Sequence, residues 1–368
     1  MRILQTPVRV YATGGVEQYV LCLSRALAVR GHQVQILAAD EPGPLSVPDT
    51  VAVIPLPYIG KLANTNITPT LPLHLLKRKA DIIHTHLPAP WSSDWSGIIA
   101  RVKKIPLVLN YYNDIAGIGL YSPIARAYNR SFLTLLLSKA EVILVNRPHF
   151  LSQHLVHYKD KIRFIPPGVD TGHFFPRQSP RKWDLFFLSV LDRYHHYKGL
   201  DSLLSALVIV KKHRPDVRLL LGGAGELLEY YRSRIHSLGL RDNVEFAGYI
   251  PYFSLPDYYS RSRIFVLPSS DPNLEGFGMV TLEAMACATP VITTPVSGVA
   301  DEIRAAGAGI IQDPGSPERL AEAIADLLDD EDRISRMGRA GRELVERRYS
   351  WERIAGEVEG VYREVMGF

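Results

Sequence analysis

Cysteine and long apolar runs are both scarce in this chain. Its 368 residues include two cysteines, Cys22 and Cys287, which lie far apart in apolar helical surroundings. Two isolated cysteines favour a reducing compartment over a disulfide framework. We expect no signal peptide, because the first residues lead directly into a segment punctuated by proline and glycine. No apolar run is long enough to cross a bilayer, so we expect a cytoplasmic protein, either free or peripheral on the inner face of the membrane.

The length and composition of the chain predict two globular domains. Hydrophobic residues make up 46% and charged residues 22% of the sequence, which is typical of a soluble globular protein. A chain of 368 residues exceeds one ordinary domain, and each half is long enough to bury a core of its own.

Positive charge is concentrated in the first half. Residues 1–180 hold 19 Lys and Arg against 10 Asp and Glu, a charge of +9, and residues 181–368 hold 23 against 28, a charge of −5. The first half contains two basic clusters, which are Lys77, Arg78 and Lys79, and Arg101, Lys103 and Lys104. These clusters indicate either an anionic partner, such as a membrane surface, or solvated helix ends. We expect no nucleic-acid partner, because the clusters lack interleaved aromatic residues and no recognition module is present.

The first half opens with a β-α-β pattern. Residues 1–10 contain a strand candidate, Gly14 and Gly15 follow it, residues 18–30 have the spacing of an amphipathic helix, and residues 32–38 form the next strand candidate. This order predicts a parallel sheet. Ligands bind outside the carboxyl ends of the strands in such a sheet. The two glycines therefore form either a ligand-binding loop or a tight turn without a ligand.

Polar residues end two later strand candidates of the first half. His84 and His86 end one of them, and Tyr112, Asn113 and Asp114 follow the next. A His-x-His pair is a metal-binding pattern, but no third ligand has a suitable spacing. We therefore expect polar lining of a binding cleft and no metal site.

The second half is organised around a loop that joins an apolar strand to a helix. Residues 275–278 read Glu-Gly-Phe-Gly, and residues 279–288 have helical character. The first turn of a helix presents unpaired N–H groups, so the amides after Gly278 are suited to hold a phosphate or diphosphate. Glu275 and Glu283 are eight positions apart, which suits them to hold hydroxylated groups on either side of that phosphate. The alternative is an ordinary strand-loop-helix unit with solvated glutamates.

Cations and glycines follow two other strand candidates of the second half. Arg193 and Lys198, five positions apart, come after the apolar run 185–190. Two cations past a strand end either meet both phosphates of a nucleoside diphosphate or belong to a solvated basic loop. Gly223 lies in a glycine loop after the next strand candidate, where a nucleotide can pack closely.

The segment EGFGMVTLEAMACATPVITT resembles the donor-site motif of the retaining GT-B glycosyltransferases, in particular glycosyltransferase family 4. The resemblance implies that Glu275 faces the transferred sugar, that Glu283 binds the nucleotide ribose, and that Arg193 and Lys198 bind the diphosphate. With Glu275, Arg193 and Lys198 as catalytic residues, it implies a donor site of Gly15, Arg193, Lys198, Gly223, Ile250, Glu275, Gly276, Phe277, Gly278, Met279, Val280 and Glu283. It also implies an acceptor or sugar pocket of Gly14, His86, Tyr112, Asn113 and Asp114.

The sequence departs from the family pattern at two positions. Tyr112 stands where relatives usually carry a His that meets the donor sugar, and Pro167 replaces an Asn in the segment 165–170. A Tyr hydroxyl can donate a hydrogen bond to a sugar hydroxyl, but it carries no charge near neutral pH. Asn113 and Asp114 remain candidates for binding sugar hydroxyls.

The resemblance covers nearly the whole chain and implies the GT-B architecture, in which two Rossmann-like domains face each other across a cleft. We expect an acceptor-binding domain at residues 1–175 and a nucleotide-sugar-binding domain at residues 183–350. The segment 171–182 has linker composition. The terminal helix 351–368 is expected to cross back onto the first domain.

The implied activity is a retaining glycosyl transfer without a metal or other cofactor. A hexose would pass from a UDP- or GDP-sugar to a glycan, lipid-linked or small-molecule acceptor, in cell-envelope polysaccharide or glycoconjugate synthesis. Arg193, Lys198 and the amides after Gly278 would stabilise the charge on the leaving phosphate. The segment Asp271-Pro-Asn273 is the nearest approach to a metal-binding Asp-x-Asp.

Three other functions are compatible with the same architecture. A sugar-nucleotide epimerase would need acid and base carboxylates in the cleft. A phosphorylase would need a lysine that carries pyridoxal phosphate, and no such context is present. A non-catalytic protein that binds a sugar nucleotide or a glycan is the third alternative, and Tyr112 is the residue that favours it.

Overall fold

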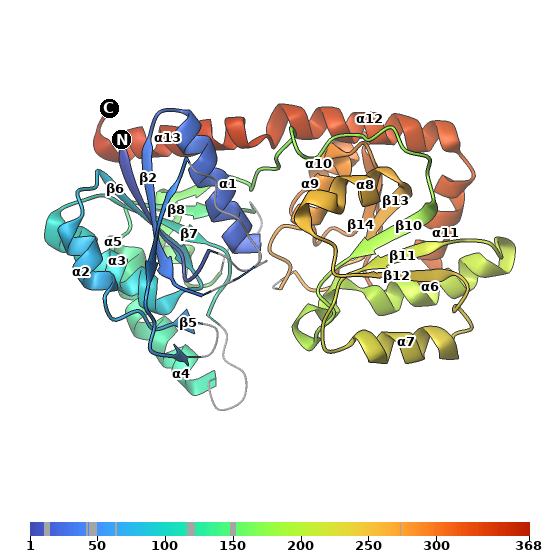
Figure 1. Ribbon diagram of the computed structural model, residues 1–368, viewed down its shortest axis with the longest axis horizontal. Coiled ribbons are helices and arrows are strands. Elements are labelled where there is room, and N and C mark those ends of the chain that lie inside the picture. Colours follow the sequence, from blue (N-terminus) through green and yellow to red (C-terminus); the bar gives the residue numbers. More distant parts are fainter. Residues whose placement is uncertain are drawn as a thin grey trace. The chain divides into compact units, whose positions relative to one another are not determined.

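The computed structural model describes residues 1–10, 15–41, 43, 50–62, 65–115, 122–147, 152–272 and 274–368. The chain forms two compact units (Figure 1). Unit 1 comprises Met1–Gly168 and Trp351–Phe368, and unit 2 comprises Val169–Ser350. Each unit is built around its own parallel sheet with helices packed on it, which is the pair of Rossmann-like folds that the sequence predicts.

Within the described residues, the sheet of unit 1 has seven strands in the order β3-β2-β1-β6-β7-β8-β9. Its strands are β1 (Arg2–Thr6), β2 (Gln33–Ala39), β3 (Ala52–Leu56), β6 (Ile82–Leu87), β7 (Leu107–Tyr111), β8 (Val142–Val145) and β9 (Ile162–Phe164), and a separate two-stranded sheet contains β4 (Lys61–Leu62) and β5 (Thr65–Asn66). The helices are α1 (Gly15–Val29), α2 (Leu71–Lys77), α3 (Pro90–Lys103), α4 (Ser122–Tyr128), α5 (Thr134–Lys139) and α13 (Trp351–Met366), with shorter turns at Asn129–Leu133 and Val156–Lys161.

Successive apolar side chains along the strands of unit 1 point to alternate faces of the sheet, and they form two cores, one on each face. Ile3 and Ile82 pack with the helices α1 and α13, whereas their neighbours Leu4 and Ile83 pack with α2, α3 and α5. Successive side chains of a strand point to opposite faces, so each apolar pair supplies both cores. The direction in which the chain adds strands reverses between β1 and β6.

In the part of unit 2 that the structure describes, the sheet has six parallel strands in the order β12-β11-β10-β13-β14-β15. They are β10 (Trp183–Leu188), β11 (Leu219–Gly222), β12 (Val244–Gly248), β13 (Ser262–Leu267), β14 (Val291–Thr293) and β15 (Gly309–Ile311). The helices are α6 (Leu200–His213), α7 (Leu228–Ser237), α8 (Leu255–Ser260), α9 (Met279–Ala286), α10 (Ala300–Ala306), α11 (Pro317–Leu328) and α12 (Glu331–Arg348), with short 3-10 turns at Arg193–Lys198 and Tyr252–Ser254. The chain reverses its direction across this sheet between β10 and β13.

The segment 171–182 is packed into unit 2 and is not a free linker. Phe174 is 1% exposed and belongs to the core of the unit. Arg342 of α12 donates hydrogen bonds to the backbone carbonyls of Thr171, at 3.2 Å, and of Phe174. Proline content predicted a linker here, but a buried aromatic side chain and carbonyl groups held by an arginine fix the segment instead.

The terminal helix α13 belongs to unit 1, where it packs against α1. Its inner face contributes Ile354, Val358 and Tyr362 to the same core as Tyr19 and Leu23 of α1. Within the described residues, no helix combines the length and the apolar character needed to cross a membrane.

Candidate functional site

The first part of the candidate site lies in unit 2, where the strand order reverses. β10 and β13 are neighbours there and run parallel. The segments that follow their carboxyl ends, Arg193–Lys198 after β10 and residues 269–272 and 274–278 after β13, start from the same edge of the sheet. Ligands of open α/β sheets bind at such a reversal, outside the strand ends.

Lys198 and Glu275 meet at this reversal. The Lys198 Nζ lies 2.8 Å from both carboxylate oxygens of Glu275, and the Ser269 hydroxyl donates to the Oε2 atom at 2.6 Å. The side chain of Glu275 is 2% exposed and that of Lys198 is 15% exposed. A carboxylate that is this deeply buried requires a cation or several donors, and here it has a cation and a hydroxyl donor. The structure therefore brings together two of the three residues predicted to be catalytic.

Arg193, the third of these residues, lies apart from that pair. Its side chain is 82% exposed, and its Nε atom lies 3.3 Å from a carboxylate oxygen of Glu226. The turn that carries Arg193 and Lys198 begins at Asp192, which accepts a hydrogen bond from the His195 backbone N–H. An exposed arginine on this turn is free to reorient, whereas Lys198 is held in place.

The glycine loop before α9 leaves room for a ligand to approach its backbone. Gly278 is the N-cap of α9 and has a φ of +84°, in the left-handed region that favours glycine. A Cβ atom added to Gly276 would meet no atom within 4 Å. The Thr281 hydroxyl is buried and has no hydrogen-bond partner among the described residues. Phe277 is buried, while Met279 and Val280 are partly exposed. The loop therefore offers unpaired amides and an open surface at the start of a helix.

Glu283 lies in a separate, buried environment in α9. The Tyr259 hydroxyl donates to its Oε2 atom at 2.9 Å, and its Oε1 atom makes no hydrogen bond with the described residues. Burial raises the pKa of Glu283 to about 7, although the Tyr259 hydrogen bond acts in the opposite direction. No hydrogen bond or ion pair among the described residues joins Glu283 to Lys198 or Glu275.

Two further predicted residues, Gly223 and Ile250, follow β11 and β12. Gly223 has a φ of +127°, and a Cβ atom there would lie 1.8 Å from the Ser189 carbonyl oxygen, so only glycine fits. Ile250 is 6% exposed and belongs to the core of unit 2. It packs over Gly222, where an added Cβ atom would lie 2.8 Å from its Cδ1 atom. Ile250 therefore supports the sheet edge as a core residue.

A second set of polar residues lies in unit 1, near the reversal between β1 and β6. His84 and His86 of β6 are buried and stacked, with ring centroids 4.7 Å apart. Burial lowers the pKa of His84 to about 4 and holds the pKa of His86 well below 6.5. Both rings are therefore neutral near pH 7. Among the described residues, no three His, Cys, Asp or Glu side chains gather as a metal-ligand set.

The hydrogen bonds of this histidine pair have a defined direction. A neutral imidazole has one donor and one acceptor nitrogen. His84 Nε2 lies 2.6 Å from the Asn110 Oδ1, which only accepts, so His84 Nδ1 accepts from the Tyr362 hydroxyl at 2.7 Å. The Gln5 Nε2 lies 3.3 Å from the same nitrogen, which leaves the Gln5 Oε1 to accept from His86 Nε2 at 2.7 Å.

Tyr112 lies at the end of this chain of hydrogen bonds. Its hydroxyl lies 3.1 Å from His86 Nδ1, which is the acceptor nitrogen when Nε2 carries the proton. The Tyr112 hydroxyl therefore donates to His86, and its oxygen retains lone pairs that can accept a hydrogen bond. A Tyr hydroxyl can also donate to a sugar hydroxyl, but in this structure the proton of Tyr112 is directed to His86.

The remaining predicted residues of unit 1 are Asn113 and Asp114, which follow Tyr112, and the two glycines Gly14 and Gly15. The Asp114 carboxylate accepts a hydrogen bond from the Tyr111 hydroxyl, and the buried Asn113 Oδ1 has no partner among the described residues. Gly15 is the exposed first residue of α1. Gly14 lies outside the described residues.

Several residues with clear roles in these two sites were missed by the sequence analysis. Ser269 follows the end of β13 directly, and a hydroxyl residue at a strand end was a usable signal. Gln5 and Asn110 lie inside apolar strands, and a polar residue within such a strand was also a usable signal. Tyr259 and Tyr362 lie on helices distant in sequence, and nothing local marked them.

Two family models match successive parts of the chain. The model described as glycosyltransferase family 4 matches residues 13–173, and the model described as glycosyl transferases group 1 matches residues 174–344. The two matches meet close to the boundary between unit 1 and unit 2, at Gly168 and Val169.

Two relatives of known name match different shares of this chain. The GDP-mannose-dependent alpha-(1-6)-phosphatidylinositol monomannoside mannosyltransferase of Mycobacterium tuberculosis is 32% identical over 214 residues, which is 55% of this chain and 56% of the relative. This match thus spans little more than half of that relative's length. The D-inositol 3-phosphate glycosyltransferase of Paenarthrobacter aurescens is 28% identical over 96% of this chain and 93% of the relative.

A solved structure with the same fold is HepE from Anabaena in complex with UDP. It superimposes with a TM-score of 0.80 at 17% sequence identity, and the match covers 99% of this chain and 100% of that chain. At this identity the similarity concerns the fold alone.

Proposed function

The chain belongs to the GT-B glycosyltransferases of the family 4 type, and we propose that it transfers a hexose from a nucleotide diphosphate sugar with retention of the anomeric configuration. The observation that carries this proposal is the Lys198–Glu275–Ser269 cluster at the strand reversal of unit 2. A buried cation and carboxylate beside an open glycine loop and a helix start provide partners for a sugar and for a diphosphate.

The donor is bound by unit 2 in this proposal. The amides after Gly278 and the Lys198 ammonium meet the diphosphate, and Arg193 turns from Glu226 to join them. Glu275 holds sugar hydroxyls through its carboxylate, and Glu283 accepts from the ribose through its Oε1 atom. Gly223 allows the nucleotide to approach the backbone.

The chemical step exchanges one bond at the anomeric carbon for another on the same face. The bond from that carbon to the phosphate oxygen breaks, the bond to the acceptor oxygen forms, and the leaving phosphate oxygen takes the acceptor proton. Negative charge grows on that oxygen as the bond breaks, and Lys198 and Arg193 lower its energy without a divalent metal. Glu275 positions the sugar and forms no covalent bond to it.

The acceptor is bound by unit 1 in this proposal. Asn113 supplies a carbonyl oxygen that has no partner among the described residues, and Tyr112 supplies an oxygen whose proton is directed to His86. Both atoms accept, so they suit an acceptor that presents hydroxyl groups. The relatives named above act on inositol-containing molecules, one of them a phosphatidylinositol mannoside. We therefore propose a polyol, glycan or lipid-linked acceptor, reached in the cytoplasm or at an anionic membrane surface through the basic unit 1.

A thermal-shift screen of UDP-, GDP- and ADP-sugars tests the donor assignment. A ligand that binds only the folded state at a concentration of 100 times its dissociation constant stabilises it by about 2.7 kcal/mol. We expect sugar nucleotides with one of the three nucleobases to raise the melting temperature of the wild type. They should do the same for the control variant Lys212→Ala, in which an exposed cation elsewhere in unit 2 is removed. The same sugar nucleotide should give little shift with Lys198→Ala. Equal shifts in all three proteins would place the nucleotide elsewhere.

A further inference from the structure

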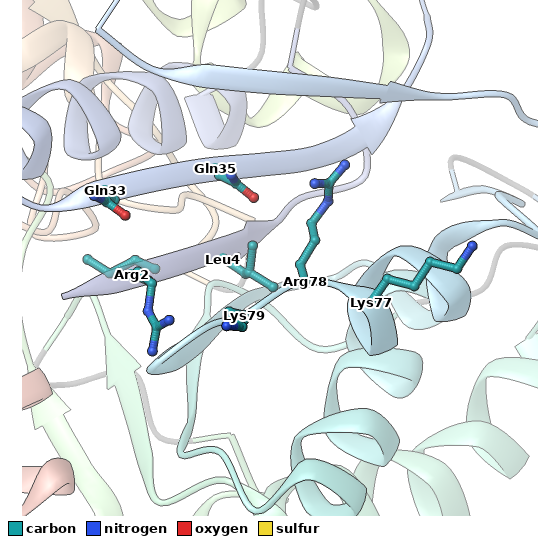
Figure 2. Close-up of a pocket in the computed structure, with 8 residues that line it drawn as sticks. Arg2, Leu4, Gln33, Gln35, Lys77, Arg78 and Lys79 are labelled. Carbon is teal, nitrogen blue, oxygen red and sulfur yellow. The ribbon is translucent and has the colours of Figure 1, made fainter.

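A cavity of about 320 Å³ lies in unit 1 at the edge of the sheet opposite to Tyr112 and His86. Arg2 of β1 and Gln33 and Gln35 of β2 line it near the amino ends of their strands, and Lys77, Arg78 and Lys79 at the end of α2 complete the lining. Figure 2 shows Arg78 extending from the end of α2 toward the strand that carries Gln35. The cavity is therefore separate from the proposed acceptor site.

The side chains around this cavity carry a surplus of positive charge. Arg2 is engaged by Asp81, which accepts from its Nε atom at 3.1 Å and from its backbone N–H at 2.7 Å. Lys77 and Lys79 form no ion pair with the described residues, and neither does Arg78. One neutralised cation and three cations without a carboxylate leave the cavity with a net charge of about +3.

The backbone on the α2 side of the cavity is fixed in place. Lys103 of α3 donates from its Nζ atom to the carbonyl of Leu75, at 3.0 Å, and to the carbonyl of Arg78. The ammonium thus binds carbonyl groups at the end of α2 and ties them to α3. Arg78 has extended backbone angles as the C-cap of α2. The segment that presents the three cations is therefore anchored to a neighbouring helix.

Several hydrogen-bond donors at the cavity have no protein acceptor. The Arg78 Nε atom is buried and has no partner among the described residues. Its Nη2 atom has only a 3.4 Å contact with His74. The side-chain amides of Gln33 and Gln35 make no hydrogen bonds within the described parts of the chain. A buried guanidinium nitrogen without an acceptor indicates that an anion from outside the chain completes the site.

We propose that this cavity binds the phosphate group of a phosphate ester. A guanidinium fork, the Lys79 ammonium and two primary amides are donors that match the acceptor oxygens of phosphate, while Lys77 extends away from Gln33 and Gln35 (Figure 2). The volume leaves room for a small polyol attached to the phosphate. Leu73 and Leu76 are 54% and 44% exposed and share one face of α2 with Lys77. The bound phosphate ester is therefore either a lipid headgroup or a soluble phosphorylated compound.

The test compares two double variants of the full chain with the wild type. Arg78→Gln with Lys79→Gln removes two cations from the cavity. Arg339→Gln with Lys212→Gln makes the same chemical changes at exposed positions of unit 2. One arm titrates sn-glycerol 3-phosphate by calorimetry, with glycerol as the blank. The other arm measures cosedimentation with vesicles of phosphatidylglycerol and phosphatidylcholine, and with vesicles of phosphatidylcholine alone.

We expect the Arg78/Lys79 variant to bind at least about tenfold more weakly than the wild type and the matched control, because two charge-assisted contacts are lost. Weaker binding of sn-glycerol 3-phosphate by the Arg78/Lys79 variant supports a phosphate site that takes soluble esters. Weaker binding by this variant only to phosphatidylglycerol vesicles identifies the lipid headgroup as the source of the phosphate. Gln33→Glu with Gln35→Glu, on the opposite wall, should weaken binding likewise. Equal binding by all variants in both arms overturns the proposal, and neither arm depends on sugar transfer.

Discussion

The ammonium of Lys198 lies 2.8 Å from both carboxylate oxygens of Glu275, although 77 positions separate the two residues in the chain. They come from the ends of the two strands between which the sheet of unit 2 reverses its order. The contact therefore joins the two halves of that sheet at the point where ligands of such folds bind. It also gives a carboxylate that is only 2% exposed a cationic partner.

Removing either member of this pair should lower both the stability of the fold and the rate of sugar transfer. Lys198→Met and Glu275→Gln should each lower the free energy of unfolding by about 3–5 kcal/mol, because a charge is left without its partner in a buried site. Each should also lower the rate of sugar transfer by at least about a hundredfold, because a preorganised charge is lost. Urea unfolding and initial rates measure the two effects.

The double variant Lys198→Met/Glu275→Gln provides the control. It leaves no unpaired buried charge, so most of the lost stability should return, while transfer should stay as low as in the single variants. Recovery of the transfer rate together with stability would mean that the pair has only a structural role.

Nucleotide binding should release a proton near pH 7. The pKa of Glu283 is raised to about 7 by burial, so about half of the molecules carry the proton at that pH. Ribose hydroxyls that donate to Glu283 favour the ionised form and lower its pKa. Calorimetry with the nucleoside diphosphate in buffers of different ionisation enthalpy measures the release, which Glu283→Gln should abolish. The same release from that variant would contradict the assignment of Glu283 to the ribose.

Tyr112 should act as a hydrogen-bond acceptor with its proton on the side of His86. Nitrogen-15 NMR should show His86 protonated at Nε2 and unprotonated at Nδ1. Tyr112→Phe should weaken acceptor use about tenfold or more, whereas Tyr230→Phe, at an exposed tyrosine of α7, should have no effect. Protonation of His86 at Nδ1 would require both the Gln5 and Asn110 amides to be turned over, and it would reverse the polarity of Tyr112.

Unit 1 should lose stability in acid because of its buried histidine pair. The pKa of His84 is about 4 and the pKa of His86 is lowered in the same direction, so the fold favours the neutral rings. Their contribution is fully present above pH 6.5 and is lost as the pH falls toward 4. Thermal unfolding from pH 8 to pH 4 should therefore be less pH-dependent in His84→Gln/His86→Gln than in the wild type. The control variant His236→Gln changes an exposed residue and should match the wild type. An unchanged slope in the double variant would contradict the account.

The strands and the glycine loop could be predicted because their signals are local. The apolar runs that became β10 and β13 are buried on both faces, as continuous apolar sequence indicates. The start of α9 directly after Gly278 also follows from residues that are adjacent in sequence. These features place Glu275 at a strand end without further information.

The contacts that decide chemistry depend on residues that are distant in sequence. The hydrogen bond between Tyr362 and His84 spans 278 positions, and no local pattern marks it. The polarity of Tyr112 follows from Gln5, Asn110 and Tyr362 together, so the sequence alone could not predict it. Proline content likewise predicted a linker at residues 171–182, although Phe174 is buried in the core of unit 2.

The most direct test of the proposed function is a transfer assay with the sugar nucleotide that the thermal-shift screen identifies. NMR of the reaction, with inositol, an inositol phosphate and an inositol lipid as acceptors, should show one new glycoside with the anomeric configuration of the donor for each nucleoside diphosphate released. The rate should be unchanged in EDTA and abolished by Glu275→Ala. Tight binding of the sugar nucleotide without any glycoside product, or conversion of the sugar nucleotide into its epimer, would contradict the account.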